Sequence, residues 1–166
     1  MTDYPITEQL DKRHTRTAFS CSEPTLDTYI RQYASQDQKR RVAAVFVLAA
    51  EDGSIKGYYT LSSLSIPTEY LSEQLQKQLP RHPYQPATLL GRLAVDTKYQ
   101  GKGLGEMLLM DALYRSYASS EQVGSIAVVV DAINRRAAAF YEEYGFIAFV
   151  ESDRLFLPMQ TIAQLF

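Results

Sequence analysis

One segment near the middle of the chain restricts the fold more than any other: an apolar run that leads through closely spaced glycines into a helical pattern. Residues 89–105 read LLGRLAVDTKYQGKGLG, and apolar residues then recur at helical spacing. Because the turn joins a strand to a helix that must cover the sheet, an α/β layout follows. Small turn residues let backbone N–H groups approach an anion, and the helix N-terminus adds a favourable dipole. We therefore expect a phosphate or pyrophosphate at this turn.

The spacing of the glycines excludes two common phosphate loops. A Walker A loop ends in Gly-Lys-Ser/Thr, but here Lys102 is followed by Gly103. A dinucleotide-binding fingerprint needs a sixth-position glycine, where this chain has Glu106, and it belongs to an early strand–helix unit. The pattern that remains is Gln100-x-x-Gly103-x-Gly105. Taken alone, these glycines fit a β–α turn without a ligand equally well.

The other elements follow from apolar periodicity and from turn residues. Two apolar runs flank Asp52-Gly53, a strong hairpin signal, and Ser22-Glu23-Pro24 has the residues of a helix start. Strands are expected at 4–10, 42–50, 55–66, 88–95, 126–130, 146–150 and 155–157, with helices at 22–33, 71–79, 104–117 and 134–144. The prolines at 83 and 86 predict an extended loop before the strand that begins at 88. This order predicts an α/β mixed sheet, and without repeats or long linkers we expect a single domain over residues 1–166.

Composition narrows the setting of the protein. The single cysteine, Cys21, excludes an intramolecular disulfide and suits a reducing compartment. The chain shows no signal peptide and no run of 18 apolar residues, so we expect a cytoplasmic protein without membrane spans. No metal site is expected, and the two histidines, His14 and His82, lie in polar stretches that suggest surface positions. A net charge of −2 means that any contact with RNA must come from a local basic patch.

A second motif lies thirty residues beyond the glycine turn. Asn134 can cap a helix that ends near Gly145, and Tyr141 lies two turns further on the same side, with the small Ala137 between them. Core positions are expected for the aromatic residues Phe140, Tyr144 and Phe146. A buried tyrosine bonded to a carbonyl, and a plain helix cap, are the structural alternatives for Tyr141 and Asn134.

Together the two motifs resemble the GNAT acetyltransferases. That resemblance implies a mixed, mostly antiparallel central sheet flanked by helices, and acetyl-CoA as the acyl donor. It implies that the turn holds the pyrophosphate, that the preceding strand edge pairs with pantetheine, and that Tyr141 is the catalytic acid for the departing thiolate. The residues implied in cofactor binding are Leu93, Ala94, Val95, Gln100, Gly101, Lys102, Gly103, Leu104, Gly105, Asn134, Ala137 and Tyr141.

A narrower resemblance extends from about Phe19 to Pro158. The segments Asp37–Val42, Gly57–Ser62, Leu79–Arg81, Leu90–Val95 and Arg154–Pro158 occur in the order found in the GNAT toxins of bacterial toxin–antitoxin systems. This resemblance implies acetylation of the α-amine of aminoacyl-tRNA, which blocks translation, and a ribbon-helix-helix antitoxin as partner. A homodimer is also expected. The candidate tRNA-binding residues are Lys39, Arg40, Arg41, Arg81 and Arg92.

The sequence offers no marked general base. Asp96, Asp131 and Glu142 are possible bases, but no motif singles out any of them. A lysine amine, with a pKa of about 10.4, needs a base near neutrality, whereas an α-amine, with a pKa of about 7.7–8.0, is already partly neutral. The missing base therefore favours an α-amine acceptor.

Two other functions remain open at this point. One is an N-acetyltransferase acting on a small-molecule amine or on a peptide or protein amine, for which an acidic acceptor cleft would be the sign. The other is a non-catalytic acyl-CoA-binding module, which would keep the glycine turn and lose the acid. The presence of Tyr141 argues against the second.

Overall fold

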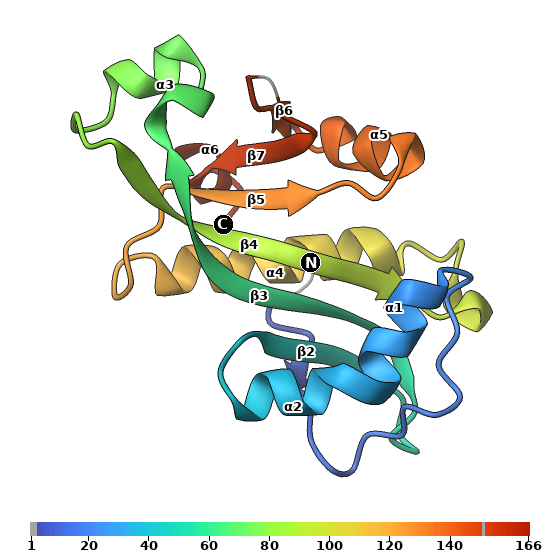
Figure 1. Ribbon diagram of the computed structural model, residues 1–166. Helices are drawn as coiled ribbons and strands as arrows, with labels where there is room; N and C mark the ends of the chain where they lie inside the picture. The colour runs from blue at the N-terminus through green and yellow to red at the C-terminus, as the bar shows by residue number, and fades with distance from the viewer. Residues whose placement is uncertain (1–2, 151) are drawn as a thin grey trace. The chain divides into compact units, whose positions relative to one another are not determined.

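The computed structural model describes residues 3–150 and 152–166 and contains a seven-stranded sheet (Figure 1). The strand order is β1-β2-β3-β4-β5-β7-β6. Strands β4 and β5 pair in parallel, while β1–β2, β2–β3, β5–β7 and β6–β7 are antiparallel. The predicted α/β class with a mixed, mostly antiparallel sheet is confirmed.

The elements follow one another along the chain with short connections. The strands are β1 (Glu8–Gln9), β2 (Ala44–Ala49), β3 (Ile55–Pro67), β4 (Tyr84–Val95), β5 (Ala127–Asp131), β6 (Ile147–Ala148) and β7 (Arg154–Pro158). The α-helices are α1 (Pro24–Thr28), α2 (Ala34–Lys39), α3 (Glu73–Lys77), α4 (Leu104–Ser119), α5 (Arg135–Glu143) and α6 (Met159–Ala163). A π-helical turn, η1 (Tyr29–Tyr33), joins α1 to α2, and two 3₁₀ turns, η2 (Thr68–Tyr70) and η3 (Thr97–Tyr99), follow β3 and β4.

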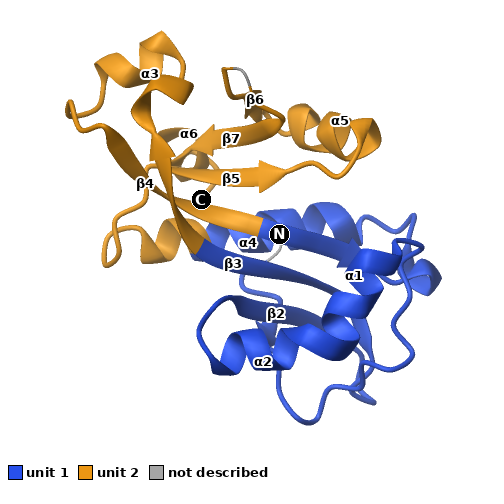
Figure 2. Ribbon diagram, in the orientation of Figure 1, with its two compact units in different colours: residues 1–62, 91–115 blue, residues 63–90, 116–166 orange. Residues whose placement is uncertain are grey.

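The chain forms two compact units, coloured separately in Figure 2. Unit 1 holds residues 1–62 and 91–115, and unit 2 holds residues 63–90 and 116–166. The chain passes between them inside β3, β4 and α4. A single domain over residues 1–166 stays a prediction.

Unit 1 has its core between the α1–α2 segment and strands β2 and β3. Ile30, Val45 and Tyr58 are completely buried there, and Ala94 of β4 belongs to the same cluster. A buried carboxylate, Asp111 of α4, ties the N-terminal segment to the unit. It accepts hydrogen bonds from the Ile6 amide, the Thr7 hydroxyl and the Tyr59 hydroxyl, the last at 2.6 Å.

Unit 2 is built on β5. Its residues Ala127, Val128, Val129 and Val130 are all completely buried, as expected for a strand covered on both faces. Phe149 stacks on Phe156 of β7 with ring centroids 4.9 Å apart. These two rings form one apolar cluster with Ile66, Leu71 and Leu75.

Several predicted boundaries are wrong for identifiable reasons. Strand β4 begins at Tyr84, not at residue 88, because the prolines favour an extended backbone that can continue into the strand, and the Pro86 carbonyl accepts the Ile126 amide. Strand β6 covers only two of the five residues expected, and helix α6 is not foreseen. Ser22 adopts a φ of +75° and Glu23 takes the N-cap position of α1, without a side-chain cap.

His14 is buried, which corrects the expectation of a surface histidine. Its Nδ1 accepts the Asp11 amide at 2.9 Å, and its Nε2 lies 2.8 Å from a Glu8 carboxylate oxygen. Burial lowers the pKa of His14, with a further lowering from the Arg13 guanidinium. His82, in contrast, is exposed as expected. In the part of the chain that the structure describes, no helix has the length and apolar character to cross a membrane.

Candidate functional site

In unit 1 the chain leaves β4, passes through η3 and reaches two glycines with left-handed backbone. Gly101 and Gly103 have φ values of +78° and +80°, a region that side-chain-bearing residues rarely adopt. A Cβ atom at either position would meet nothing within 4 Å. The glycines are therefore required by backbone conformation, and the space beside them is open.

Backbone amides converge at this turn. None of the hydrogen bonds within residues 3–150 and 152–166 uses the amide of Gln100, Gly101, Lys102 or Gly103 as donor. Helix α4 begins at Leu104, so its first N–H groups also lack partners inside the helix. Alternating backbone conformations with free amides form a concavity that binds anions. The turn therefore has free amides and open space that could hold an anion.

Side chains brace the turn from behind. Asp96 is buried, and its carboxylate accepts the Ser20 amide at 3.2 Å and the Lys98 amide at 2.9 Å. The Gln100 side chain donates to the Val95 carbonyl at 2.9 Å. Because both Asp96 carboxylate oxygens accept backbone amides, this carboxylate stabilises the conformation of the loop.

Strand β4 offers a backbone edge immediately before the turn. Its parallel register with β5 covers only Thr88–Leu90, which pair with Val128–Val130. The later residues Leu93, Ala94 and Val95 have no register partner on β5 among the described residues. Ala94 is buried and its two neighbours are half-buried. Free edge groups of this kind can pair with an amide-bearing ligand as an added strand does.

In unit 2, helix α5 is capped at both ends as its sequence predicts. The Asn134 side chain accepts the Ala137 amide at 2.9 Å. At the other end Gly145 has a φ of +95°, its amide donates to Glu142, and the Phe146 amide donates to Tyr141. This pair of hydrogen bonds is a Schellman motif, which fixes where Tyr141 lies relative to Phe146.

Tyr141 is 8% exposed, and its ring packs against Phe146 with centroids 5.4 Å apart. Its hydroxyl makes no hydrogen bond to any residue that the structure describes. The hydroxyl oxygen is not completely buried, so a ligand or water can reach it. Burial raises the pKa of Tyr141 well above its usual value. The structural alternative, a hydroxyl bonded to a carbonyl, has no support among these residues. Phe146 is buried as predicted, whereas Phe140 and Tyr144 are only half-buried.

The other two candidate bases have cationic partners. Asp131 accepts from Arg154 Nε at 2.7 Å, and Glu142 accepts from Arg135 Nη1 at 2.7 Å. Both pairs are exposed, so water competes for them. Neither carboxylate is marked as a base by burial or by a catalytic partner.

Four of the five candidate RNA contacts lie in unit 1: Lys39, Arg40, Arg41 and Arg92. Lys39, Arg40 and Arg41 are exposed at the end of α2, where Arg40 is the C-cap residue and Arg41, which follows it, has a left-handed φ of +63°. The Val42 amide closes this turn on the Asp37 carbonyl at 2.8 Å. The Asp37 carboxylate also accepts the Tyr29 hydroxyl at 2.8 Å, and the Arg92 guanidinium lies 3.6 Å above the Tyr29 ring centroid.

Comparison with known proteins decides the family. Residues 8–146 match the acetyltransferase (GNAT) family. The chain belongs to the GNAT acetyltransferase family. Among curated relatives, a probable toxin TacT of Sinorhizobium fredii is 33% identical, covering 96% of this chain and 94% of its own. A tRNA-acetylating toxin of Mycobacterium tuberculosis is 35% identical, covering 88% of this chain and 86% of its own.

Solved structures of similar acetyltransferases have the same fold over nearly the whole chain. A tyrosine-to-phenylalanine variant of KacT superposes with a TM-score of 0.91 at 32% identity, covering 96% of this chain and 98% of its own. AtaT in complex with acetyl-methionyl-tRNAfMet has a TM-score of 0.89 at 30% identity, with coverages of 96% and 97%. A tyrosine-to-phenylalanine variant of AtaT, bound to acetyl-CoA and to the C-terminus of its antitoxin AtaR, has a TM-score of 0.82 at 26% identity, covering 96% of each chain.

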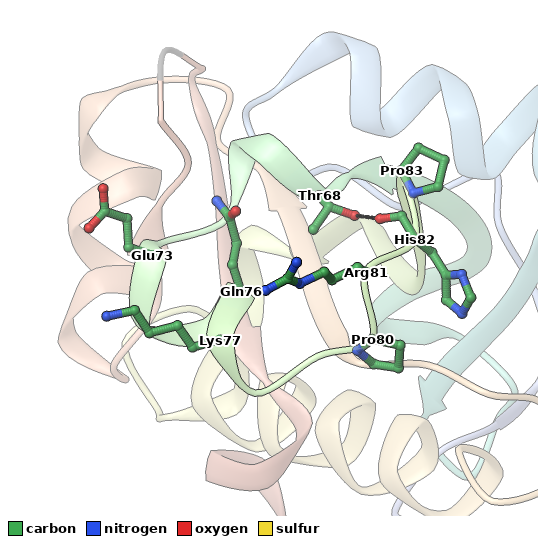
Figure 3. Close-up of a pocket in the computed structure, with 8 residues that line it drawn as sticks. All are labelled: Thr68, Glu73, Gln76, Lys77, Pro80, Arg81, His82 and Pro83. Carbon is green, nitrogen blue, oxygen red and sulfur yellow. Dashed lines mark hydrogen bonds between the residues drawn. The ribbon is translucent and has the colours of Figure 1, made fainter.

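The fifth candidate contact of this acetyltransferase, Arg81, lies in unit 2. It lines a hollow of about 600 Å³ in the connection between β3 and β4, together with Thr68, Glu73, Gln76, Lys77, Pro80, His82 and Pro83. In Figure 3 the Arg81 side chain extends toward Gln76, while Lys77 points away from it. The Gln85 side chain braces the rim by donating to the Pro80 carbonyl at 2.9 Å.

Proposed function

We propose that this acetyltransferase is the toxin of a toxin–antitoxin pair and transfers an acetyl group from acetyl-CoA to the α-amine of aminoacyl-tRNA. The observation that carries the proposal is similarity to a tRNA-acetylating toxin over 88% of the chain. The fold of AtaT in its complex with acetylated methionyl-tRNA supports it. An acetylated α-amine cannot form a peptide bond, so the reaction blocks translation.

The glycine turn is the proposed place of the cofactor's pyrophosphate. Acetyl-CoA, when bound, supplies an acetyl group activated as a thioester. The free amides of Gln100–Gly103, the N-terminus of α4 at Leu104 and Gly105, and the open space at Gly101 and Gly103 fit a diphosphate. Lys102 adds an exposed cation. The edge at Leu93–Val95 fits the pantetheine amides, and the family resemblance adds Asn134 and Ala137 to this set.

Tyr141 is the proposed acid. As the acceptor nitrogen forms its bond to the acetyl carbon, the carbon–sulfur bond breaks, and the Tyr141 hydroxyl donates its proton to the departing thiolate. Burial raises the pKa of Tyr141, so the hydroxyl is protonated at neutral pH. The hydroxyl has no competing acceptor among the described residues, which leaves its proton for the thiolate. The proton released by the acceptor amine leaves through water and restores the phenol.

The acceptor is proposed to be an α-amine because the candidate bases are engaged. Asp96 accepts backbone amides, while Asp131 and Glu142 pair with arginines. An acceptor that is partly neutral near pH 7.7–8.0 needs less help from a base than lysine does. The exposed cations Lys39, Arg40 and Arg41 would contact RNA phosphates, since each contact releases counterions.

Partners and location follow from the same proposal. AtaT is solved with its antitoxin, which supports an antitoxin partner here. A ribbon-helix-helix antitoxin and a homodimer rest on the toxin resemblance alone, and a substrate of charged tRNA implies the cytoplasm. Light scattering of the purified chain, alone and with the antitoxin, tests the assembly.

The experiment that tests the function measures transfer of radiolabelled acetyl from acetyl-CoA to three acceptors: aminoacyl-tRNA, a polyamine and a peptide. We expect label on aminoacyl-tRNA, at a rate that falls steeply as salt rises. A variant combining Lys39→Ala, Arg40→Ala and Arg41→Gly should lower that rate and keep acetyl-CoA affinity. Glycine is chosen at 41 because it adopts the left-handed backbone without strain and removes the charged side chain. Label on the polyamine or the peptide, with none on charged tRNA, would overturn the proposal in favour of a general N-acetyltransferase.

A further inference from the structure

Arg92 of β4 is a half-buried cation with unused hydrogen-bonding capacity. Its guanidinium carbon lies over the Tyr29 ring, 3.6 Å from the ring centroid. No hydrogen bond or ion pair joins the Arg92 side chain to another residue in the part of the chain that the structure describes. A guanidinium carries five N–H donors, and donors withdrawn from water without a partner cost free energy. The N–H donors of Arg92 are therefore available to an acceptor from outside the protein.

The orientation of Arg92 is set by its neighbours. Tyr29 is 5% exposed, and its hydroxyl donates to Asp37 Oδ2 at 2.8 Å, so the ring cannot turn freely. Tyr29 also opens the π-helical turn η1, a rare geometry that concentrates at functional sites. Stacking occupies one face of the guanidinium and leaves its edge free. That edge is the part that binds a phosphate with two parallel hydrogen bonds.

The position of Arg92 separates it from the cofactor phosphates. Side chains alternate along a strand, so Arg92 shares a face with Ala94, which lies in the same core cluster as Tyr29. At roughly 3.3 Å per residue, Arg92 lies about 10 Å before Val95, and the glycine turn comes only after that. Arg92 is thus at the far end of the proposed pantetheine edge, where the acetyl group and the acceptor amine would meet.

We propose that Arg92 binds a phosphodiester of the single-stranded 3′ end of aminoacyl-tRNA, and that Tyr29, held by Asp37, is its positioning residue. The inference rests on the proposed function. The amino acid is esterified to the last ribose, so the nearest anion to the amine is the phosphodiester of that terminal nucleotide. The backbone carbonyl of Asp37 also accepts the Val42 amide, which closes the turn of Lys39–Arg41. One residue thus anchors both groups of proposed phosphate contacts in unit 1.

The test compares two acceptors that differ in phosphate. One is methionyl-tRNA, and the other is 3′-O-methionyl-adenosine, which has the same amine, ester and terminal nucleoside but no phosphate. Arg92→Gln should raise KM for methionyl-tRNA by 10- to 100-fold and lower the slope of log(kcat/KM) against log[salt] by about one. Its effect on the nucleoside acceptor should be at least tenfold smaller. Arg92→Lys, which keeps the charge but not the planar fork, should keep the slope and raise KM less.

The positioning role has its own readout. Tyr29→Phe and Asp37→Asn should raise KM for methionyl-tRNA several-fold and leave the acetyl-CoA Kd and kcat near wild type. The control is Lys12→Gln, which removes one exposed charge of unit 1 and should change neither KM nor the slope. A lower melting temperature with an unchanged KM for Tyr29→Phe would show a purely structural tyrosine and overturn its positioning role.

The outcomes separate the two proposals. If wild-type protein acetylates the nucleoside or a polyamine but not methionyl-tRNA, the proposed function fails. If it acetylates methionyl-tRNA and Arg92→Gln keeps the wild-type KM and salt slope, the Arg92 inference is overturned while the function stands. An equal loss on both acceptors would also overturn the inference, because the phosphate would then be irrelevant.

Discussion

Replacement of Tyr141 by phenylalanine removes one oxygen atom from a ring that otherwise keeps its contacts. The ring packs against Phe146 at 5.4 Å, and that contact survives in the variant. The hydroxyl has no hydrogen-bond partner among the described residues, so no protein–protein bond is lost. We therefore expect a change in unfolding free energy close to zero, against about 0.5–1.5 kcal/mol for loss of a typical hydrogen bond.

Turnover should respond in the opposite way. If the hydroxyl supplies the proton to the thiolate, its removal should lower kcat by about 10²- to 10⁴-fold, the usual contribution of a general acid. The acetyl-CoA Kd should stay near wild type because the glycine turn is untouched. Burial raises the pKa of Tyr141, so the protonated form persists as pH rises. Any alkaline fall in kcat caused by this group should therefore begin above pH 10, the usual pKa of tyrosine.

Tyr59→Phe is the matched control for this experiment. The Tyr59 hydroxyl donates to buried Asp111 at 2.6 Å, so its loss should cost about 1–3 kcal/mol of stability. Tyr59 has no proposed part in the chemistry, and kcat should remain near wild type at a temperature where the variant is folded. Thermal unfolding and single-turnover acetylation measure both quantities. A Tyr141→Phe variant that turns over at the wild-type rate would refute the role of acid and leave this tyrosine a packing residue.

Three other changes test separate parts of the structure. Gly105→Asp places an acid in the first turn of α4, where it favours the helix dipole but repels a diphosphate, so calorimetry should show a folded variant without acetyl-CoA affinity. Gly57→Val should destabilise unit 1 by about 1–3 kcal/mol in denaturant titrations, because even a Cβ at this site would lie 2.9 Å from the Ala94 carbonyl oxygen. Burial lowers the pKa of His14 below 6.5, so the unfolded chain binds more protons as pH falls below that value and stability should fall with it. His14→Gln should flatten this slope, and an unchanged slope would show that other groups control it.

Features set by local chemistry could be predicted from the sequence. The glycine turn, the Asn134 cap and the left-handed Gly145 all depend on residues within a few positions of one another. The buried strand β5 was also predictable, since a continuous apolar run has few other places in an α/β fold. These local patterns were sufficient to predict the fold class and the turn proposed to bind the cofactor.

Features that depend on contacts between distant segments could not be predicted. Tyr29 and Asp37 lie in a helical region, and nothing in that pattern indicates that Arg92 of β4 stacks on the ring. Asp111 reads as one more polar position of α4, yet it binds the N-terminal segment more than 100 residues away. His14 stands among basic residues that suggest a surface, but a backbone amide and a carboxylate take both ring nitrogens. In each case the partner, not the residue itself, decides the role.

A chain with a net charge of −2 can still bind an anionic substrate if some of its cationic side chains are grouped on one part of the surface. Arg41 illustrates the cost: at a helix end that usually carries glycine, a side chain in the left-handed region is unfavourable by about 1–2 kcal/mol. Glycine would relieve this strain, but it would also remove a cationic side chain that is exposed beside Lys39 and Arg40. Arg41→Gly should accordingly raise the unfolding free energy and weaken RNA acetylation in the same variant. A stabilised variant with undiminished RNA acetylation would show that the strain at this turn serves something other than the substrate.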